Sequence, residues 1–214
     1  MLLIALITHA SGLVLWSQQV AHLPIFTPAE TLSSLGFIIA LLTLGLYWRS
    51  QYRFQIQLWT LIIISLLLTT AVLWPAAPPC FDYNHSYIYA LLFHLFRRLA
   101  LALGLFASAI FISALTCRNS NSPTAINLRG QGRLVIITAT LAYLLSEDIG
   151  IIWCQKGWAD IWRWSPGFMI STMVLIYLML ALHLPGGSRK PGNWYSLIGL
   201  SCGPIMFIAQ FFKP

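Results

Sequence analysis

Long apolar runs, separated by short polar or proline-rich stretches, recur along the whole chain. Each run approaches the ~20 apolar residues that a helix needs to cross the hydrocarbon core of a bilayer. The pattern predicts seven helices, over residues 2–20, 32–48, 55–75, 87–115, 134–152, 167–185 and 195–212. These helices leave almost no residues for a soluble domain. We therefore expect one transmembrane domain over residues 1–214, an all-α, polytopic helical bundle.

The composition strengthens this interpretation, because 58% of the residues are hydrophobic and only 8% are charged. Soluble domains carry about 25% charged residues. The first apolar run is followed by His22 and a proline-containing turn, without a small-residue cleavage site. We therefore expect a retained helix there rather than a signal peptide.

The basic residues predict how the chain is oriented. Seven of the twelve fall in three alternate connections that contain no acidic residue: Arg49, Arg53, Arg118, Arg129, Arg133, Arg189 and Lys190. By the positive-inside rule these connections are cytoplasmic or stromal, which puts the N-terminus inside. The net charge of +7 is therefore interpreted as a topology signal and not as a sign of nucleic-acid binding. The polar connection over 118–133 predicts a flexible loop or a short interfacial segment.

The stretch from Trp153 to Pro166 holds four of the nine tryptophans, Trp153, Trp158, Trp162 and Trp164. It lies between two apolar runs and predicts a short loop on the outer side. Tryptophan prefers the membrane interface, so one interpretation is an aromatic belt. The other is a flat apolar platform for a large planar ligand such as a porphyrin, since a belt usually places only one or two tryptophans at a helix end.

Ionisable side chains within the apolar runs are functional candidates, because charge is costly in lipid. His94, Arg97 and Arg98 share a helix face through their i, i+3 and i, i+4 spacing. Imidazole ligates haem iron, and guanidinium groups suit haem propionates. The alternative role of the two arginines is to pair inside the bundle with Glu147 and Asp148 of the fifth helix.

The remaining histidines and cysteines leave further alternatives open. His183, near the inner end of the sixth helix, either ligates a haem or meets the interface. For His9, mid-span in the first helix, we expect only a hydrogen bond to a neighbouring carbonyl. Cys80 and Cys154 fall in connections on the same outer side. They either form a disulfide or remain unrelated thiols. The sequence shows no phosphate loop and no convincing Ser/His/Asp set, so a nucleotide enzyme or hydrolase has no support.

The tryptophan stretch resembles the tryptophan-rich "WWD" signature of the cytochrome c assembly family, in particular the membrane component of the System II cytochrome c synthase. The family pattern is similar to W-A-x-x-x-W-G-x-x-W-x-W-D-P-K-E. In register with it stand Trp153, Trp158, Trp162, Trp164 and Pro166. The segment His22–Leu32 resembles the family's H-x-P-x-x-N-x-Y-E-S-L segment. His94 and His183 resemble its first external and its transmembrane haem-ligand histidines.

The chain also departs from the family pattern. Ser165 stands in place of the signature aspartate, and Gly167 and Phe168 stand in place of the following lysine and glutamate. The second external histidine, expected in a G-L-H-S-Y context, has no counterpart in Gly199–Phe207. The missing histidine would remove one of the two ligands that hold haem over the tryptophan stretch. These departures therefore argue against full synthase activity.

The resemblance implies a haem-handling protein of a bacterial inner or thylakoid-type membrane. Haem b would enter near His183 and be presented outside on the tryptophan loop beside His94, with Arg97 and Arg98 on its propionates. Apocytochrome c and other membrane subunits would be partners. The alternative is a degenerate member serving as a non-catalytic accessory subunit of a larger respiratory or photosynthetic complex, its loop binding protein, lipid or pigment. A transporter is a third and weaker interpretation, because the sequence shows no inverted repeats.

Overall fold

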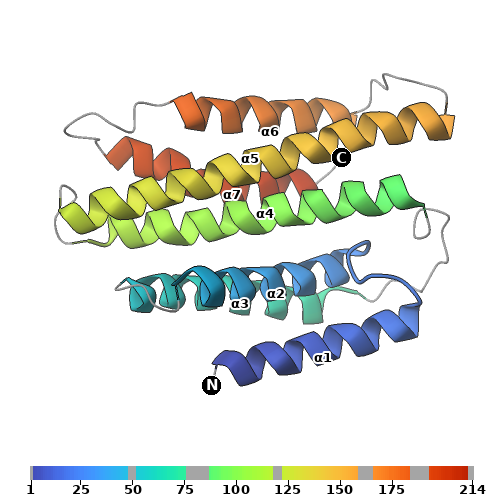
Figure 1. The fold of residues 1–214 in the computed structure, drawn as a ribbon, viewed down its shortest axis with the longest axis horizontal. Coiled ribbons are helices and arrows are strands. Elements are labelled where there is room, and N and C mark those ends of the chain that lie inside the picture. The colour runs from blue at the N-terminus through green and yellow to red at the C-terminus, as the bar shows by residue number, and fades with distance from the viewer. Residues whose placement is uncertain are drawn as a thin grey trace.

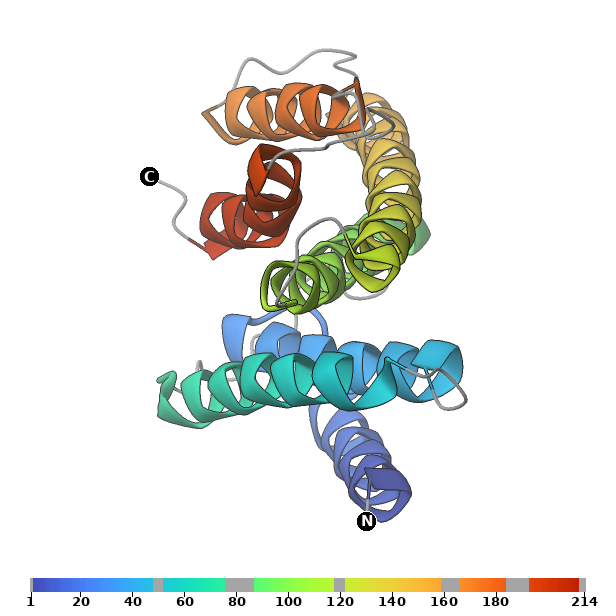
Figure 2. The same cartoon turned by 90° about the vertical axis from the view of Figure 1, so that its left-hand side faces the viewer.

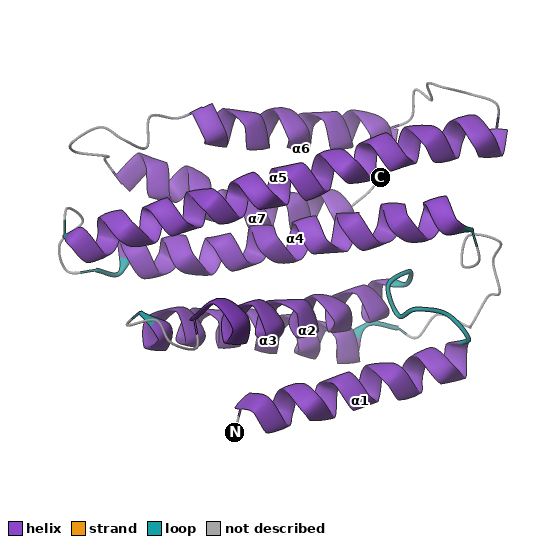
Figure 3. Ribbon diagram, viewed as in Figure 1, coloured by secondary structure: helices purple, strands orange, loops and turns teal. Residues whose placement is uncertain are grey.

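The structure, a computed structural model, describes residues 2–47, 52–75, 87–117, 122–158, 166–183 and 193–211. All regular structure in these residues is α-helical (Figure 3). The helices are α1 (Leu2–Val20), α2 (Pro28–Tyr47), α3 (Arg53–Leu73), α4 (Ile88–Leu115), α5 (Pro123–Trp158), α6 (Pro166–His183) and α7 (Asn193–Phe211). The predicted all-helical fold is confirmed.

Successive helices run in alternate directions, so their termini collect at two ends of the bundle (Figure 1). One end, which we call the His94 end, holds the last turns of α1, α3 and α5 and the first turns of α2, α4 and α6. The opposite end, the His183 end, holds the last turns of α2, α4 and α6. Helix termini that are far apart in sequence are thereby brought to a common end of the bundle.

Six of the seven helices are long and apolar enough to cross a membrane, and the apolar part of α6, Gly167–His183, is shorter. Large apolar side chains are exposed on the bundle surface, among them Phe54, Val72 and Leu73 of α3. Such a surface suits lipid rather than water, because soluble proteins rarely expose large contiguous apolar patches.

Helix α4 forms the centre of the bundle. It lies between the layer of α2 and α3 and the group of α5, α6 and α7 (Figure 2), and it contacts α2, α3, α5 and α7. In its most apolar stretch 83% of the residues are buried, against 6% in α1. Its core side chains include Phe106, Ile110 and Phe111, which are completely buried. Most residues in this stretch of α4 are therefore shielded from the surroundings of the bundle by the other helices.

The contact between α4 and α7 depends on small residues. A Cβ atom on Gly203 would lie 2.7 Å from the carbonyl oxygen of Gly104, so the two helix backbones approach closely. Pro204 within α7 lacks an N–H and cannot bond the carbonyl of Leu200. The Ser108 hydroxyl of α4 donates to that carbonyl instead, at 2.7 Å.

Two helices begin at least one turn earlier than the apolar pattern predicts, α2 at Pro28 and α5 at Pro123. Helix α5 begins at Pro123, so the prediction of a loop or short interfacial segment over 118–133 is wrong from there on. Ser122 accepts the Ala125 N–H at 3.2 Å as the N-cap, and proline is favoured as the first helical residue. Leu128 is completely buried, so packing outweighs the weak helix propensity of this polar stretch.

The tryptophan stretch also differs from its prediction, because α5 continues through Trp158. Trp153 therefore belongs to a helix and not to a loop running from 153 to 166. Lys156 lies in the last turn, where a cation favours the helix dipole, and its Nζ lies 5.5 Å from the ring centroid of Tyr89. Trp162 and Trp164 lie outside the described residues.

Candidate functional site at the His94 end

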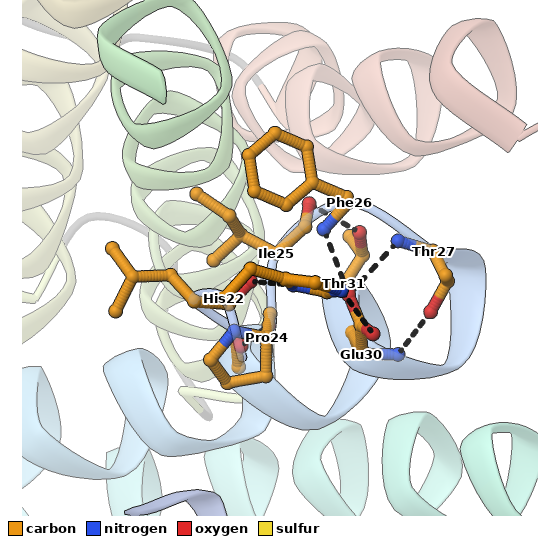
Figure 4. A network of polar contacts seen from close by, with 9 residues as sticks. His22, Pro24, Ile25, Phe26, Thr27, Glu30 and Thr31 are labelled. Atoms are coloured by element: carbon orange, nitrogen blue, oxygen red, sulfur yellow. Dashed lines mark hydrogen bonds and ion pairs between the residues drawn. The ribbon is translucent and has the colours of Figure 1, made fainter. Parts of the chain in front are cut away.

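The turn between α1 and α2 is held by Glu30, which is only 2% exposed (Figure 4). Its carboxylate accepts the backbone N–H groups of Phe26 and Thr27 at 3.0 and 3.1 Å. The Thr27 hydroxyl accepts the Glu30 N–H at 3.3 Å, which completes a capping box. His22 Nε2 lies 3.9 Å from the same carboxylate. Glu30 thus gives the turn a fixed shape.

The start of α2 holds the other side of this turn. The Thr31 hydroxyl donates to the carbonyl of Ile25 at 3.1 Å (Figure 4). The Ser34 hydroxyl donates to the carbonyl of Pro24. Both hydroxyls are buried. Because all these bonds join residues within one short stretch of sequence, the turn is built locally and then presents its carbonyls and rings to α4.

The turn contacts α4 through two consecutive residues, Ile25 and Phe26. Arg98, 4% exposed, donates from Nε to the carbonyl oxygen of Ile25 at 3.2 Å. The ring of Phe26 packs edge-on against His94, with 5.0 Å between centroids. The segment that begins at His22 and the start of α4, far apart in sequence, therefore meet at the His94 end.

His94 lies among aromatic rings from three elements. In addition to Phe26, its ring contacts Phe93 at 5.2 Å and Trp153 of α5 at 6.4 Å, all as edge contacts. Phe93 and Trp153 lie 5.8 Å apart. A Cβ atom on Gly150 would come within 3.1 Å of Phe93, so glycine there lets α5 approach. The imidazole is half-buried.

Arg97 points to the other side of α4 and forms an ion pair with Glu147 of α5. Its Nη2 also donates to the Ser171 hydroxyl of α6 at 3.1 Å. Its guanidinium carbon lies 4.2 Å from the ring centroid of Tyr143 and 5.1 Å from that of Phe93. The alternative predicted from sequence, charge neutralisation inside the bundle, is confirmed for this pair.

The second half of that interpretation is wrong. Asp148 is exposed, and Arg98 turns instead toward the α1–α2 turn, where Glu30 is the acidic group in electrostatic reach. The reason is helix geometry: adjacent positions point about 100° apart, so neighbouring arginines cannot face the same helix. Nη1 of Arg98 has no hydrogen-bond partner among the described residues.

The structure does not bring all the predicted site residues together. His183 is exposed at the opposite end of the bundle, where its Nδ1 lies 2.7 Å from the carbonyl oxygen of Met179. The side chains of Trp158, Trp162 and Trp164 lie outside the described residues. Cys154 is half-buried on α5, but Cys80 is outside the described part, so their disulfide stays a prediction.

The part of α7 where the family likeness would place a second external histidine, Gly199–Phe207, packs against α4. Cys202 and Gly203 of α7 are buried against α4, and the sulfur of Met206 reaches Gly104. Among the described residues no group of three or more His, Cys, Asp or Glu side chains is placed to hold a metal ion. An imidazole from the chain's own α7 is therefore not part of this site.

Several residues of this site had not been singled out from the sequence: Phe26, Thr27, Tyr143 and Ser171. The spacing Thr27-x-x-Glu30, followed by an apolar run, is a capping-box signature and would have located the start of α2. The other contacts depend on which helix faces meet, for which the sequence carries no local signal.

The chain was also compared with known proteins. No family profile, curated protein or solved structure matches it.

Proposed function

We propose that this chain is a haem-handling membrane protein similar to cytochrome c assembly proteins. The observation that carries the proposal is the meeting of three segments at the His94 end. These are the turn that begins at His22, the start of α4 with His94, and the end of α5 with Trp153. The same three segments carry the family likeness in sequence, and their proximity is what a shared site requires.

The chemistry of the site suits an amphipathic, anionic, planar ligand. His94 offers an imidazole for iron, and the rings of Phe26, Phe93 and Trp153 offer apolar surface beside it. Arg98 has a guanidinium nitrogen without a described partner, which suits a propionate. Arg97 is engaged with Glu147, so on this proposal Arg98 is the first propionate contact and Arg97 supports the pocket wall.

His183 would serve a different step. It lies at the far end of the bundle from His94 and is exposed, which suits an entry site for haem b. A haem held at the His94 end would offer its iron to the imidazole of His94 and its vinyl groups for thioether bonds to a partner's thiols. The chain's own residues bind and orient it, and the attachment to apocytochrome c belongs to a partner chain.

A second candidate function is that of a non-catalytic accessory subunit. It is favoured by the tight packing of α7 against α4, which occupies the region where a second histidine ligand is expected. It is also favoured by the Arg97–Glu147 ion pair, since these charges compensate each other inside the chain. On this proposal the exposed apolar helices bind partner subunits and lipid.

The test is a pyridine haemochrome assay on the mildly solubilised chain, with His94→Ala and His183→Ala. Haem handling predicts b-type haem near one equivalent per chain, reduced at least tenfold by His94→Ala. His183→Ala should lower haem loading in cells but leave binding of haem added to the purified protein. His9→Ala, which removes a histidine of α1 that contacts Ser33 and not the His94 cluster, is the control and should keep the wild-type amount. A colourless chain that co-purifies with partners at fixed stoichiometry would instead establish the accessory subunit.

A further inference from the structure

A second cavity lies away from the His94 cluster, between α1, α2 and α3. Its volume is about 420 Å³, within the range of small-molecule sites. The wall is mostly apolar and includes Leu6 of α1, Ala40 of α2, and Leu61 and Ile64 of α3. His9 is the ionisable side chain in this wall, and an ionisable group at membrane depth marks a functional site by default.

The hydrogen bonds of His9 define which ring nitrogen carries the proton. His9 Nε2 lies 3.1 Å from the Ser33 hydroxyl, and no other hydrogen bond of that hydroxyl is formed with the described residues. A hydroxyl proton needs an acceptor, and Nε2 is the acceptor in reach among the described residues, so we assign the Ser33 hydroxyl as the donor and Nε2 as the acceptor. The neutral ring then carries its hydrogen on Nδ1. His9 also packs edge-on against Phe37, at 5.8 Å, which fixes the ring plane.

The Nδ1–H group is the donor that the cavity leaves for a ligand. The hydroxyls of Thr8, Thr43 and Thr60 also line the cavity, but each donates to the carbonyl four residues earlier in its own helix, at 3.0, 2.7 and 2.9 Å. No described residue accepts from Nδ1 of His9. An unsatisfied donor is costly in hydrocarbon, so the cavity favours a neutral ligand with an acceptor oxygen and an apolar body.

The depth of His9 restricts the ligand further. His9 lies seven residues from Leu2 and eleven from Val20 in α1, which is about 10 Å and about 16 Å along the helix axis. The hydrocarbon core is ~30 Å thick, so the imidazole lies well inside it. Phospholipid ester groups stay at the interface, whereas a prenylated quinone carries its carbonyl oxygens on an apolar ring that enters the core.

We propose that the cavity between α1, α2 and α3 binds a prenylated quinone of the membrane pool, with a ring carbonyl accepting the Nδ1–H of His9. The quinone ring occupies the cavity beside His9, where Ala40 and Ile64 form part of the wall, and its isoprenoid tail leaves the cavity into the surrounding lipid. This site is separate from the His94 cluster and does not rest on the proposed function.

The experiment uses the full chain bound to affinity resin in detergent, incubated with a decyl-substituted benzoquinone, washed, and extracted for absorbance. Four proteins are compared: wild type, His9→Phe, Ala5→Phe and Ile4→Phe. His9→Phe keeps an aromatic ring beside Phe37 but removes the donor. Ala5→Phe fills the cavity that Ala5 lines, whereas Ile4 is 66% exposed on the outside of the same helix and is the matched control.

The expected result is saturable retention near one quinone per chain in the wild type and Ile4→Phe. Retention should weaken about tenfold in His9→Phe and disappear in Ala5→Phe. Equal retention by all four proteins would mean non-specific partition into detergent and would overturn the proposal. The lipids that the wild-type chain carries when it is purified from native membranes are a second measurement. Bound phospholipid without quinone would also overturn the proposal, since an acyl chain would then fill the cavity. Haem content is unaffected by these variants in either case.

Discussion

Arg97 and Arg98 follow one another on α4 but have different surroundings. Arg97 faces α5 and α6 and pairs with Glu147, whereas Arg98 faces the α1–α2 turn and bonds the carbonyl of Ile25. The sequence alone predicted that the buried charges of the fourth and fifth helices compensate each other. It did not predict that Arg98 turns away from the fifth helix, because the helix face that each arginine presents depends on how α4 is rotated in the bundle.

Removing one member of the buried ion pair should destabilise the chain more than removing both. Glu147→Leu leaves Arg97 as an uncompensated buried cation, and we expect the free energy of unfolding in mixed micelles to fall by about 3–5 kcal/mol. The double variant Arg97→Met with Glu147→Leu should lose clearly less. Asp148→Asn, at an exposed neighbouring position, is the control and should stay within ~0.5 kcal/mol of wild type. Additive losses in the double variant would contradict the pairing.

At the scale of elements, apolar runs located all seven helices but not all their boundaries. The predicted starts of α2 and α5 were late because Thr27-Pro28-Ala29-Glu30 and Ser122-Pro123 are helix-start signals that a hydropathy pattern does not contain. The hydropathy pattern also does not predict the close approach of α4 and α7. Small residues such as Gly104 and Gly203 are a signal for helix contact, but they do not identify the partner.

A methyl group at the contact between α4 and α7 should be destabilising. For Gly203→Ala we expect a loss of about 1–3 kcal/mol, because the new Cβ would meet the backbone of Gly104 and the Ser108 hydroxyl. Gly45→Ala on α2 is the control, since nothing lies within 4 Å of its Cβ position. There alanine should be neutral or stabilising by up to ~1 kcal/mol, as its helix propensity exceeds that of glycine. Equal thermal unfolding temperatures for the two variants would contradict the close contact.

At the scale of the whole molecule, charge is distributed unevenly between the two ends. The acidic residues with described side chains all lie toward the His94 end, Glu30 in the first turn of α2 and Glu147 and Asp148 in the second half of α5. Arg129 and Arg133 lie on the opposite half of α5, where Arg129 is buried and donates to Ser196, and Arg133 reaches the carbonyl of Leu182. These two basic residues therefore lie in a helix, and their side chains hold contacts between helices. Their position toward the His183 end is compatible with the prediction that this end faces inward.

The orientation predicted from the basic residues can be tested with single cysteines in a chain without its native thiols. Asn127→Cys lies near the start of α5 and Gln155→Cys near its end, and both positions are exposed. In intact bacterial cells, a membrane-impermeant maleimide should label Gln155→Cys at once. It should label Asn127→Cys only after the membrane is opened. The opposite pattern would show that the His183 end faces outward and that the positive-inside prediction is wrong here.

The burial of α4 has a consequence for how the chain is made. Arg97 and Arg98 each disfavour transfer of a helix centre into lipid by about 2.5–3.5 kcal/mol, and the carboxylate that pairs with Arg97 is synthesised fifty residues later. A nascent chain that ends after α4 therefore carries two cations whose compensation is incomplete. We expect α4 to remain beside the insertion machinery during translation until α5 emerges, so that the two helices enter the bilayer together as a hairpin.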